Sequence, residues 1–524
     1  MSSPRGRSIL AVLCLSLLMV VVGNTVLNVA IPTLVTELDA TSSQLQWMVD
    51  SYALVFAGLL LTAGALGDRF GRKGALTIGL AIFGAASAVS ALASSPDQLI
   101  AARAVMGLGA AFVMPATLSI LTNVFVPQQR AHAIAIWAGV AGAGGAIGPV
   151  AGGWLLEHFF WGSVFLLNVP IVITAIVAGH FLVPTSLDPQ HVRFDPIGAG
   201  LSTFGVGALL YGIIEAPNHG WTAPPTLTAF TIALVTLAAF AWWELRTPHP
   251  MLDLRLFRNR RFSTGSAAIT MTFFAMFGLF FLFTQYLQLV RGYSPFQAGV
   301  RLLPMAAMLM VSAPLSAHWV DRFGPKRVVS TGLTIVGAGL LLVYFLDIGS
   351  SYWYMIGSLM VIAIGMGTTA APATTAIMSA MPLGKAGVGS AVNDTTRELG
   401  GALGVAVMGS ILASQYSSAL APALAQLPGE AAVVADASLG GALLVAQQIG
   451  GAAGSGLTTA ARIAYMDGMA LAVLGGAAVA GVAALLVARF MPAAAAMPGE
   501  ATIDRVEGGE VPTTTSPEPA RQEA

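Results

Sequence analysis

Charged residues are scarce in this sequence: Asp, Glu, Lys and Arg make up 9% of its 524 residues, and 24 basic side chains balance 24 acidic ones. A soluble protein typically carries about 25% charged residues, so the composition excludes a soluble enzyme. The zero net charge argues against nucleic acid as a partner. The single cysteine, Cys14, can form no intramolecular disulfide, and the seven histidines are scattered without metal-ligand spacing.

Motifs for chemistry are also missing. The sequence has no loop of the form Gly-x4-Gly-Lys-Ser/Thr, which argues against ATP as an energy source. It has no recognisable constellation of nucleophile, base and orienting residue. We therefore expect no enzyme activity, no cofactor and no metal.

Long apolar runs, by contrast, fill the chain: 56% of its residues are hydrophobic and the mean hydropathy is +0.79. A run of about 20 residues crosses a hydrocarbon core of ~30 Å as a helix. We predict an all-α integral membrane protein with 14 transmembrane helices. The predicted spans are 9–30, 43–66, 75–93, 96–121, 131–155, 164–183, 197–215, 225–243, 263–289, 296–319, 328–346, 352–377, 386–413 and 467–489.

The distribution of Lys and Arg predicts the orientation of these spans. With a cytoplasmic N-terminus, nineteen of the 24 basic residues lie inside, and the outer loops hold only Arg291 and Arg462. The other three, Arg103, Arg301 and Arg397, fall within spans. We predict a multi-pass membrane protein with both termini cytoplasmic.

One region leaves the number of spans open. Residues 414–460 are rich in Ala and Gly, and 440–450 is apolar enough for a fifteenth span, which would place the C-terminal tail outside. Because Asp436, Gln447 and Gln448 interrupt the stretch, we favour a long external loop, with or without a membrane-dipping hairpin.

Two other segments differ from the spans in composition. Residues 490–524 are rich in Pro, Thr and Glu, which predicts a disordered cytoplasmic tail. The linker before residue 263 predicts a cytoplasmic segment that rests on lipid headgroups, because it holds Arg255, Arg258, Arg260 and Arg261.

One motif occurs twice, as Asp-Arg-Phe-Gly-Arg-Lys at 68–73 and Asp-Arg-Phe-Gly-Pro-Lys at 321–326. Five identities at a constant offset of 253 indicate two related halves, between which secondary transporters place their substrate. The motifs lie eight spans apart instead of six, which indicates two inserted helices. The predicted parts are an N-terminal six-helix half (1–183), the inserted helices with the basic linker (184–262), a C-terminal six-helix half (263–489) and the tail (490–524).

In these motifs the chain resembles the major facilitator superfamily and, within it, the fourteen-span drug:proton antiporter group. The resemblance covers nearly all of residues 13–489, and its most specific parts are 64–73, 103–111, 139–153 and 390–401. It implies the major facilitator fold, with two six-helix halves that rock about a central site. It also implies proton-coupled efflux of drugs or antibiotics.

The resemblance gives the first copy of the repeated motif an expected role as a conformational latch. Asp68 would meet a helix N-terminus of the other half, and the arginines would meet carboxylates. The alternative is a role in topology alone, in which the basic side chains hold this short loop on the cytoplasmic side. The expected latch residues are Gly64, Asp68, Arg69, Gly71, Arg72 and Lys73.

The fifth span is exceptionally rich in glycine. Its positions 144, 148 and 152 repeat every four residues and form a flat face for a neighbouring helix, which close packing alone would explain. The resemblance adds that such a Gly-Pro run seals the path of antiporters against leak. The residues concerned are Gly144, Gly148, Pro149, Gly152 and Gly153.

Charged residues deep in the spans are the strongest indication of a functional site, because placing each one in the bilayer costs about 2.5–3.5 kcal/mol on membrane-insertion scales. Ser43 with Gln46 resembles a capping box, and Ser95 followed by Pro96 predicts a second helix start. These starts put Asp50 and Arg103 each about 10 Å from an outer helix end. We predict that the two side chains meet and that Asp50 carries the coupling proton. A fixed structural ion pair is the alternative.

A second group of deep charges lies on the thirteenth span. Asp394 and Glu398 share a helix face, with Arg397 three residues from Asp394. We predict that the two carboxylates line the cavity and attract protons or a cationic drug. A self-neutralising trio that stabilises one helix is the alternative.

The substrate cavity has less specific candidates. Many members of the group carry an acidic residue where this chain has Asn24, which cannot hold a proton, so the proton stoichiometry stays open. Span 9 is rich in Phe and Met, which suits lipid contact or packing and also a promiscuous apolar cavity. The candidate lining residues are Asn24, Asn28, Phe277, Phe281, Gln285 and Arg397.

The sequence thus predicts a secondary transporter that exports amphipathic small molecules in exchange for protons and functions as a monomer in the bilayer. A dedicated transporter of one metabolite, such as a self-made antibiotic, an amino acid or a siderophore, is the alternative. A non-transporting membrane sensor is a further one, although the chain carries no appended soluble domain beyond its tail.

Overall fold

The structure is a computed structural model that describes residues 4–27, 30, 33–34, 37–38, 42–186 and 195–493. Within these ranges it contains 14 helices long and apolar enough to cross a membrane, and no strand. The predicted all-α fold with 14 transmembrane helices is confirmed. The predicted tail from residue 494 onward lies outside the described residues.

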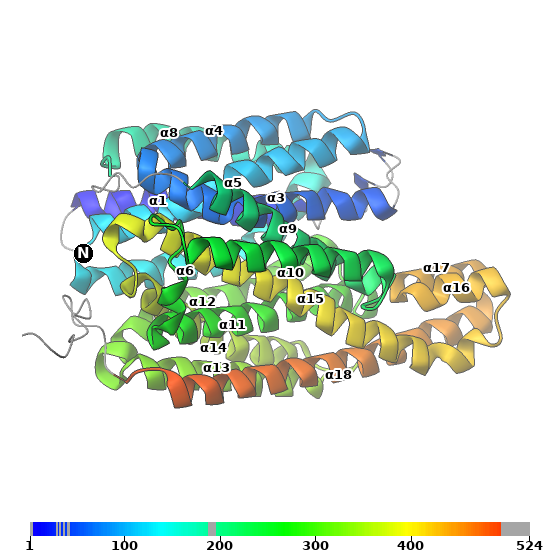
Figure 1. Ribbon diagram of the computed structural model, residues 1–524. Helices are drawn as coiled ribbons and strands as arrows, with labels where there is room; N and C mark the ends of the chain where they lie inside the picture. Colours follow the sequence, from blue (N-terminus) through cyan, green and yellow to red (C-terminus); the bar gives the residue numbers. More distant parts are fainter. Residues whose placement is uncertain are drawn as a thin grey trace, which may run out of the picture.

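The N-terminal half consists of six spans, the last of them formed by the short α7 and by α8. In Figure 1 these helices form the upper part of the bundle. Predicted boundaries agree to within a few residues; for example, Ser95 caps α5 and Pro96 begins it. The helices are α1 (Pro4–Thr25), α3 (Ser42–Phe70), α4 (Arg72–Ala91), α5 (Pro96–Val124), α6 (Pro127–His158), α7 (Ser163–Leu166) and α8 (Asn168–Leu182).

The C-terminal half forms the lower part of the bundle in Figure 1. Its helices are α11 (Arg260–Gln285), continued by the π-helix η2 (Tyr286–Val290), α12 (Pro295–Phe323), α13 (Pro325–Tyr344), α14 (Tyr352–Ser379), α15 (Ala386–Leu424) and α18 (Gly451–Phe490). The short helices η1 (Leu254–Arg258) and η3 (Leu383–Lys385) precede α11 and α15.

The two inserted helices, α9 (Pro196–His219) and α10 (Pro224–Glu244), lie along the boundary between the halves (Figure 1). α9 packs on α3 of one half and on α15 of the other. Val206 and Leu210 of α9 share an apolar cluster with Ala57 of α3 and Leu399 of α15. The insertion therefore covers one side of the seam between the halves.

Residues 414–460 form helices where a long loop was expected, so that prediction was wrong. α15 has 39 residues and α18 has 40, which at 1.5 Å per residue gives about 60 Å each, twice the hydrocarbon thickness. Their ends, with α16 (Gly429–Ala437) and α17 (Leu439–Ile449), project from the bundle in Figure 1, opposite the end where α1 begins. With 11 residues, α17 is too short to be a fifteenth span. The high helix propensity of alanine accounts for the difference.

The repeated motif forms the same turn in both halves. Gly71 joins α3 to α4 with φ 112°, and Gly324 joins α12 to α13 with φ 80°. A side chain is strained at such angles, so each turn requires glycine. The turn brings the end of one helix and the start of the next to the same face of the bundle.

Candidate functional site

The carboxylate of Asp68 joins the two halves of the molecule. It lies at the end of α3 and accepts hydrogen bonds from the backbone N–H groups of Gly387 (2.9 Å) and Val388 (3.1 Å), in the first turn of α15. Asp68 is buried, at 5% exposure, so water competes little for these bonds. An anion at a helix N-terminus is stabilised by the helix dipole and by unpaired N–H groups. This is the contact that a latch requires.

Arg72 completes the contact from the other side of the turn. Its guanidinium donates to Asp68 at 2.7 Å and to the backbone carbonyls of Leu383 (2.8 Å) and Gly384 (2.9 Å) in η3. Arg72 is 1% exposed. The expected carboxylate partners in the other half are thus replaced by carbonyl groups. These are available because η3 turns its peptide oxygens toward the end of α3.

The other expected latch residues lie around this contact. Lys73 donates to the carbonyl of His180 within its own half, and Arg69 stacks on Phe70. Gly64 allows the close approach of α3 to α15, because a Cβ atom there would lie 2.6 Å from the carbonyl oxygen of Gly387. Of the expected set, Asp68, Arg72 and Gly64 therefore contact the other half.

Arg103 is fully buried and is held by several groups of the N-terminal half. It donates to the carbonyls of Met48 (3.0 Å) and Gly23 (3.2 Å) and to the side chain of Asn24 (3.4 Å). Its guanidinium also lies 4.4 Å from the ring centroid of Tyr52. A desolvated arginine over an aromatic ring gains cation–π stabilisation.

The predicted meeting of Asp50 with Arg103 does not occur in this structure. The ion pairs formed within the described ranges do not include one between these two residues. Arg103 stacks on Tyr52, and positions 50 and 52 of a helix point about 200° apart. A group that faces Tyr52 therefore faces away from Asp50.

Asp394 and Arg397 form a buried pair on α15. Asp394 accepts from Arg397 (3.5 Å) and from the side chain of Asn393 (3.2 Å) at Oδ1. Its Oδ2 is buried and lies near the hydroxyl of Ser390, one helical turn earlier. A buried carboxylate oxygen is a favourable place for a proton.

Arg397 also contacts one aromatic ring in each half. Its guanidinium lies 4.5 Å from the ring centroid of Phe273 on α11 and 5.4 Å from that of Trp137 on α6. Trp137 is fully buried and donates to the hydroxyl of Thr117 on α5. The guanidinium of Arg397, in the C-terminal half, therefore lies against the buried ring of Trp137 in the N-terminal half.

Glu398 faces the same region. It is half-buried and interacts electrostatically with Arg397 and Asp394 on its own helix, and with Tyr52 on α3. Tyr52 thus contacts Arg103 and lies within electrostatic range of Glu398, on the side of α3 that faces both charge groups. Sequence reasoning missed Tyr52, because nothing in a single tyrosine within an apolar run distinguishes it from a packing residue.

The glycine-rich α6 packs closely against α1. Cβ atoms at Gly144, Gly148 and Gly152 would lie 2.8, 2.0 and 2.5 Å from side-chain atoms of Val21, Thr25 and Val26. The four-residue repeat thus forms the expected flat face.

A second face of α6 meets α12 of the other half. The backbone of Pro149 lies beside Gly299, and a Cβ at Gly153 would lie 3.0 Å from Phe296. Both faces leave little space for a leak beside α6.

The candidate lining residues do not gather into one group. Phe277 packs beside Gly401, and Gln285 donates to the carbonyl of Phe281 along α11. Asn24 lies with Arg103 in the other half. Asn28 lies outside the described residues. Only Arg397 and Asn24 of the candidate set belong to the central charge groups.

Comparison with known proteins matches this architecture. The family model described as Major Facilitator Superfamily matches residues 13–405. The chain is 37% identical to the multidrug efflux pump LfrA of Mycolicibacterium smegmatis, over 90% of this chain and 95% of that protein. It is 34% identical to the tetracenomycin C resistance and export protein of Streptomyces glaucescens, over 92% of this chain and 91% of that protein.

Solved structures share the fold at low sequence identity. The crystal structure of the human organic anion transporter MFSD10 superposes with a TM-score of 0.61 at 13% identity, over 93% of this chain and 100% of that one. At this identity the likeness concerns the fold alone.

Proposed function

Because the chain belongs to the Major Facilitator Superfamily, we propose that it is a secondary transporter that exports drugs or antibiotics in exchange for protons. The names of relatives at 34–37% identity over most of the chain support export of such compounds. It is a multi-pass membrane protein and not an enzyme. We further propose that it functions as a monomer in the plasma membrane with both termini cytoplasmic. The division at residues 183 and 262 is part of the same proposal.

The observation that carries proton coupling is the charge group on α15. Asp394 is buried, and Glu398, one helical turn away, interacts electrostatically with Arg397 and with Tyr52 of the other half. Binding a proton here removes a charge from the interface between the halves. Such a change alters the relative stability of two access states, as alternating access requires.

Arg397 and its aromatic neighbours suit the other step of the cycle. When Asp394 loses its proton, its charge pairs with Arg397, which is stacked between Phe273 and Trp137. A planar or cationic substrate that competes for these rings or carboxylates would release the proton. The substrate and the proton are then exchanged because they compete for the same groups.

Transport by the purified protein in liposomes tests the proposal. The test compound is methyl viologen, for which a resistance protein of Salmonella typhimurium, 34% identical to this chain, is named. Liposomes with an acid interior should accumulate it while protons leave, and an ionophore that collapses the proton gradient should abolish the accumulation. Uptake that requires protons to move in the same direction as the compound would refute the antiporter mechanism.

A variant separates coupling from transport. Glu398→Gln should retain exchange of labelled for unlabelled compound without a gradient but lose accumulation driven by protons. Glu157→Gln, at an exposed position of α6, is the matched control and should behave as the unaltered protein. Proton-driven accumulation by Glu398→Gln at the normal rate would remove Glu398 from the coupling step.

A panel of compounds tests the breadth of the substrate range. Efflux of cationic, neutral and anionic compounds, with tetracenomycin C among them, should show several substrates if the cavity is promiscuous. Transport of one compound only would favour the dedicated exporter.

A further inference from the structure

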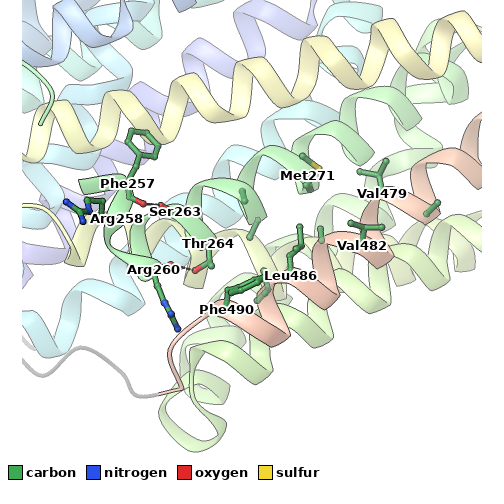
Figure 2. Close-up of a pocket in the computed structure, with 15 residues that line it drawn as sticks. Phe257, Arg258, Arg260, Ser263, Thr264, Met271, Val479, Val482, Leu486 and Phe490 are labelled. Atoms are coloured by element: carbon green, nitrogen blue, oxygen red, sulfur yellow. Dashed lines mark hydrogen bonds between the residues drawn. The ribbon is translucent and has the colours of Figure 1, made fainter. Parts of the chain in front are cut away.

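A groove opens between α11 and α18 (Figure 2), and none of the residues that line it belongs to the central charge groups. Its volume is about 640 Å³, within the range of about 300–1,000 Å³ typical of ligand sites. Eleven of its fifteen lining residues are apolar. Val482, Leu486 and Phe490 of α18 are 57%, 48% and 46% exposed, so the groove faces outward from the bundle.

The charged groups of the groove are gathered at one end. Figure 2 shows Arg258 and Arg260 at the end where Phe257 and Phe490 lie, while Met271 and Val479 lie at the other end. Both arginines are exposed, and no acidic residue lines the groove. Arg260 is also the first residue of α11, so the positive end of a 26-residue helix adds to the charge there.

This arrangement matches one class of ligand. The apolar part of the groove is a surface channel between α11 and α18 that accepts a hydrocarbon chain. The two guanidinium groups at its end can bind a phosphate with charge-assisted hydrogen bonds. A free phosphate would leave the channel unused. A cationic drug would meet two positive charges at the entrance.

We propose that this groove binds an anionic phospholipid, with an acyl chain between α11 and α18 and the headgroup phosphate on Arg258 and Arg260. The occupied groove joins the linker of the inserted helices to the last helix of the C-terminal half. The site does not depend on which compound the protein exports, so it stands or falls separately from the proposed function.

Lipid binding to the full chain tests the proposal directly. Native mass spectrometry of the purified protein, titrated with phosphatidylglycerol or phosphatidylcholine of identical acyl chains, gives the affinity for each lipid. The unaltered protein should bind phosphatidylglycerol at least tenfold more tightly. Arg258→Gln/Arg260→Gln should lower that affinity by about 25-fold, about fivefold for each arginine. Phosphatidylcholine binding should fall much less, because its cationic choline already opposes binding at two arginines. Arg255→Gln, on the same linker but outside the groove, should change neither.

A second variant tests the channel without touching its charges. Ala267 lines the groove at an exposed position, so Ala267→Phe fills the channel without disturbing the core, and it should weaken binding of both lipids. Ala488→Phe, exposed on α18 outside the groove, is its control. Equal binding of the two lipids by the unaltered protein, or a double variant that keeps its preference, would overturn the proposal. So would an Ala267→Phe variant that binds both lipids normally but loses methyl viologen transport, because the groove would then be a substrate path.

Discussion

Replacing Asp68 by Asn tests how strongly the latch holds the halves together. The substitution keeps the size of the side chain but removes its charge. In the structure that charge meets two N–H groups of α15 at 2.9 and 3.1 Å and the guanidinium of Arg72 at 2.7 Å. Arg72 would keep its two carbonyl partners but would be left as a buried cation without its carboxylate.

The magnitude follows from these contacts. Asp68 and Arg72 belong to the same half, so their ion pair persists when the halves separate and does not enter the difference. An anion in a partly buried position at a helix N-terminus contributes up to ~2 kcal/mol, and the amide of Asn retains one hydrogen bond to α15, so we expect a net loss of about 1–2 kcal/mol. The state in which α3 and α15 are joined should lose population relative to the separated state by about 5- to 30-fold.

Distances between spin labels measure this population. After Cys14, the only cysteine, is replaced by Ala, labels at Gln128 on α6 and Arg327 on α13 report the separation of the halves at the end that bears the latch. Both positions are exposed. In Asp68→Asn the distance distribution should shift toward longer values.

The second copy of the motif provides a matched control. Asp321 occupies the same position before Gly324 in the other half but is exposed, so Asp321→Asn should leave the distribution unchanged. An unchanged distribution in Asp68→Asn, in a protein that binds substrate normally, would refute the latch. Equal shifts in both variants would show that the motif acts through the net charge of its turn and not through the contact of Asp68 with α15.

Two further substitutions test the packing and the charge network. Gly148→Val should lower the thermal unfolding midpoint, because overpacking against Thr25 costs about 1–3 kcal/mol. Gly145→Ala is the control and should leave the midpoint unchanged, because its Cβ meets open space. Equal midpoints in the two variants would contradict the close contact at Gly148. Arg103→Lys should reduce the transport rate at least tenfold, because an ammonium cannot keep the three hydrogen bonds and the ring contact together; an unchanged rate in liposomes would make Arg103 dispensable.

The membrane architecture could be predicted from the sequence because hydropathy and the Lys and Arg distribution are local properties. Fourteen spans and the repeated turn follow from them directly. The helices within 414–460 could not, because alanine-rich segments favour helix even where polar residues interrupt the apolar pattern. Length and hydropathy alone do not separate a helix that projects from the bundle from a loop.

The central site was predictable only in part. Their positions within apolar spans identified Arg103 and Asp394 as deep charges, and both are buried. The partner of Arg103, however, depends on rotation about the axis of α3, which places Tyr52 instead of Asp50 beside it. Likewise, the rings that hold Arg397 come from α6 and α11, more than 100 residues away in the chain. Such neighbours become visible only when the helices are assembled.

The inserted pair is attached unequally to the two halves. Thr62 of α3 bonds with both the carbonyl of Ala199 and the hydroxyl of Thr203 on α9, and Trp47 stacks on Tyr211. On the α15 side, the hydrogen bond is between Trp221 and Ser410, at an exposed position. Under the proposed rocking of the halves, we expect the attachment to α15 to separate first and α9 and α10 to move with the N-terminal half. The pair would then cover the seam on that side as it opens.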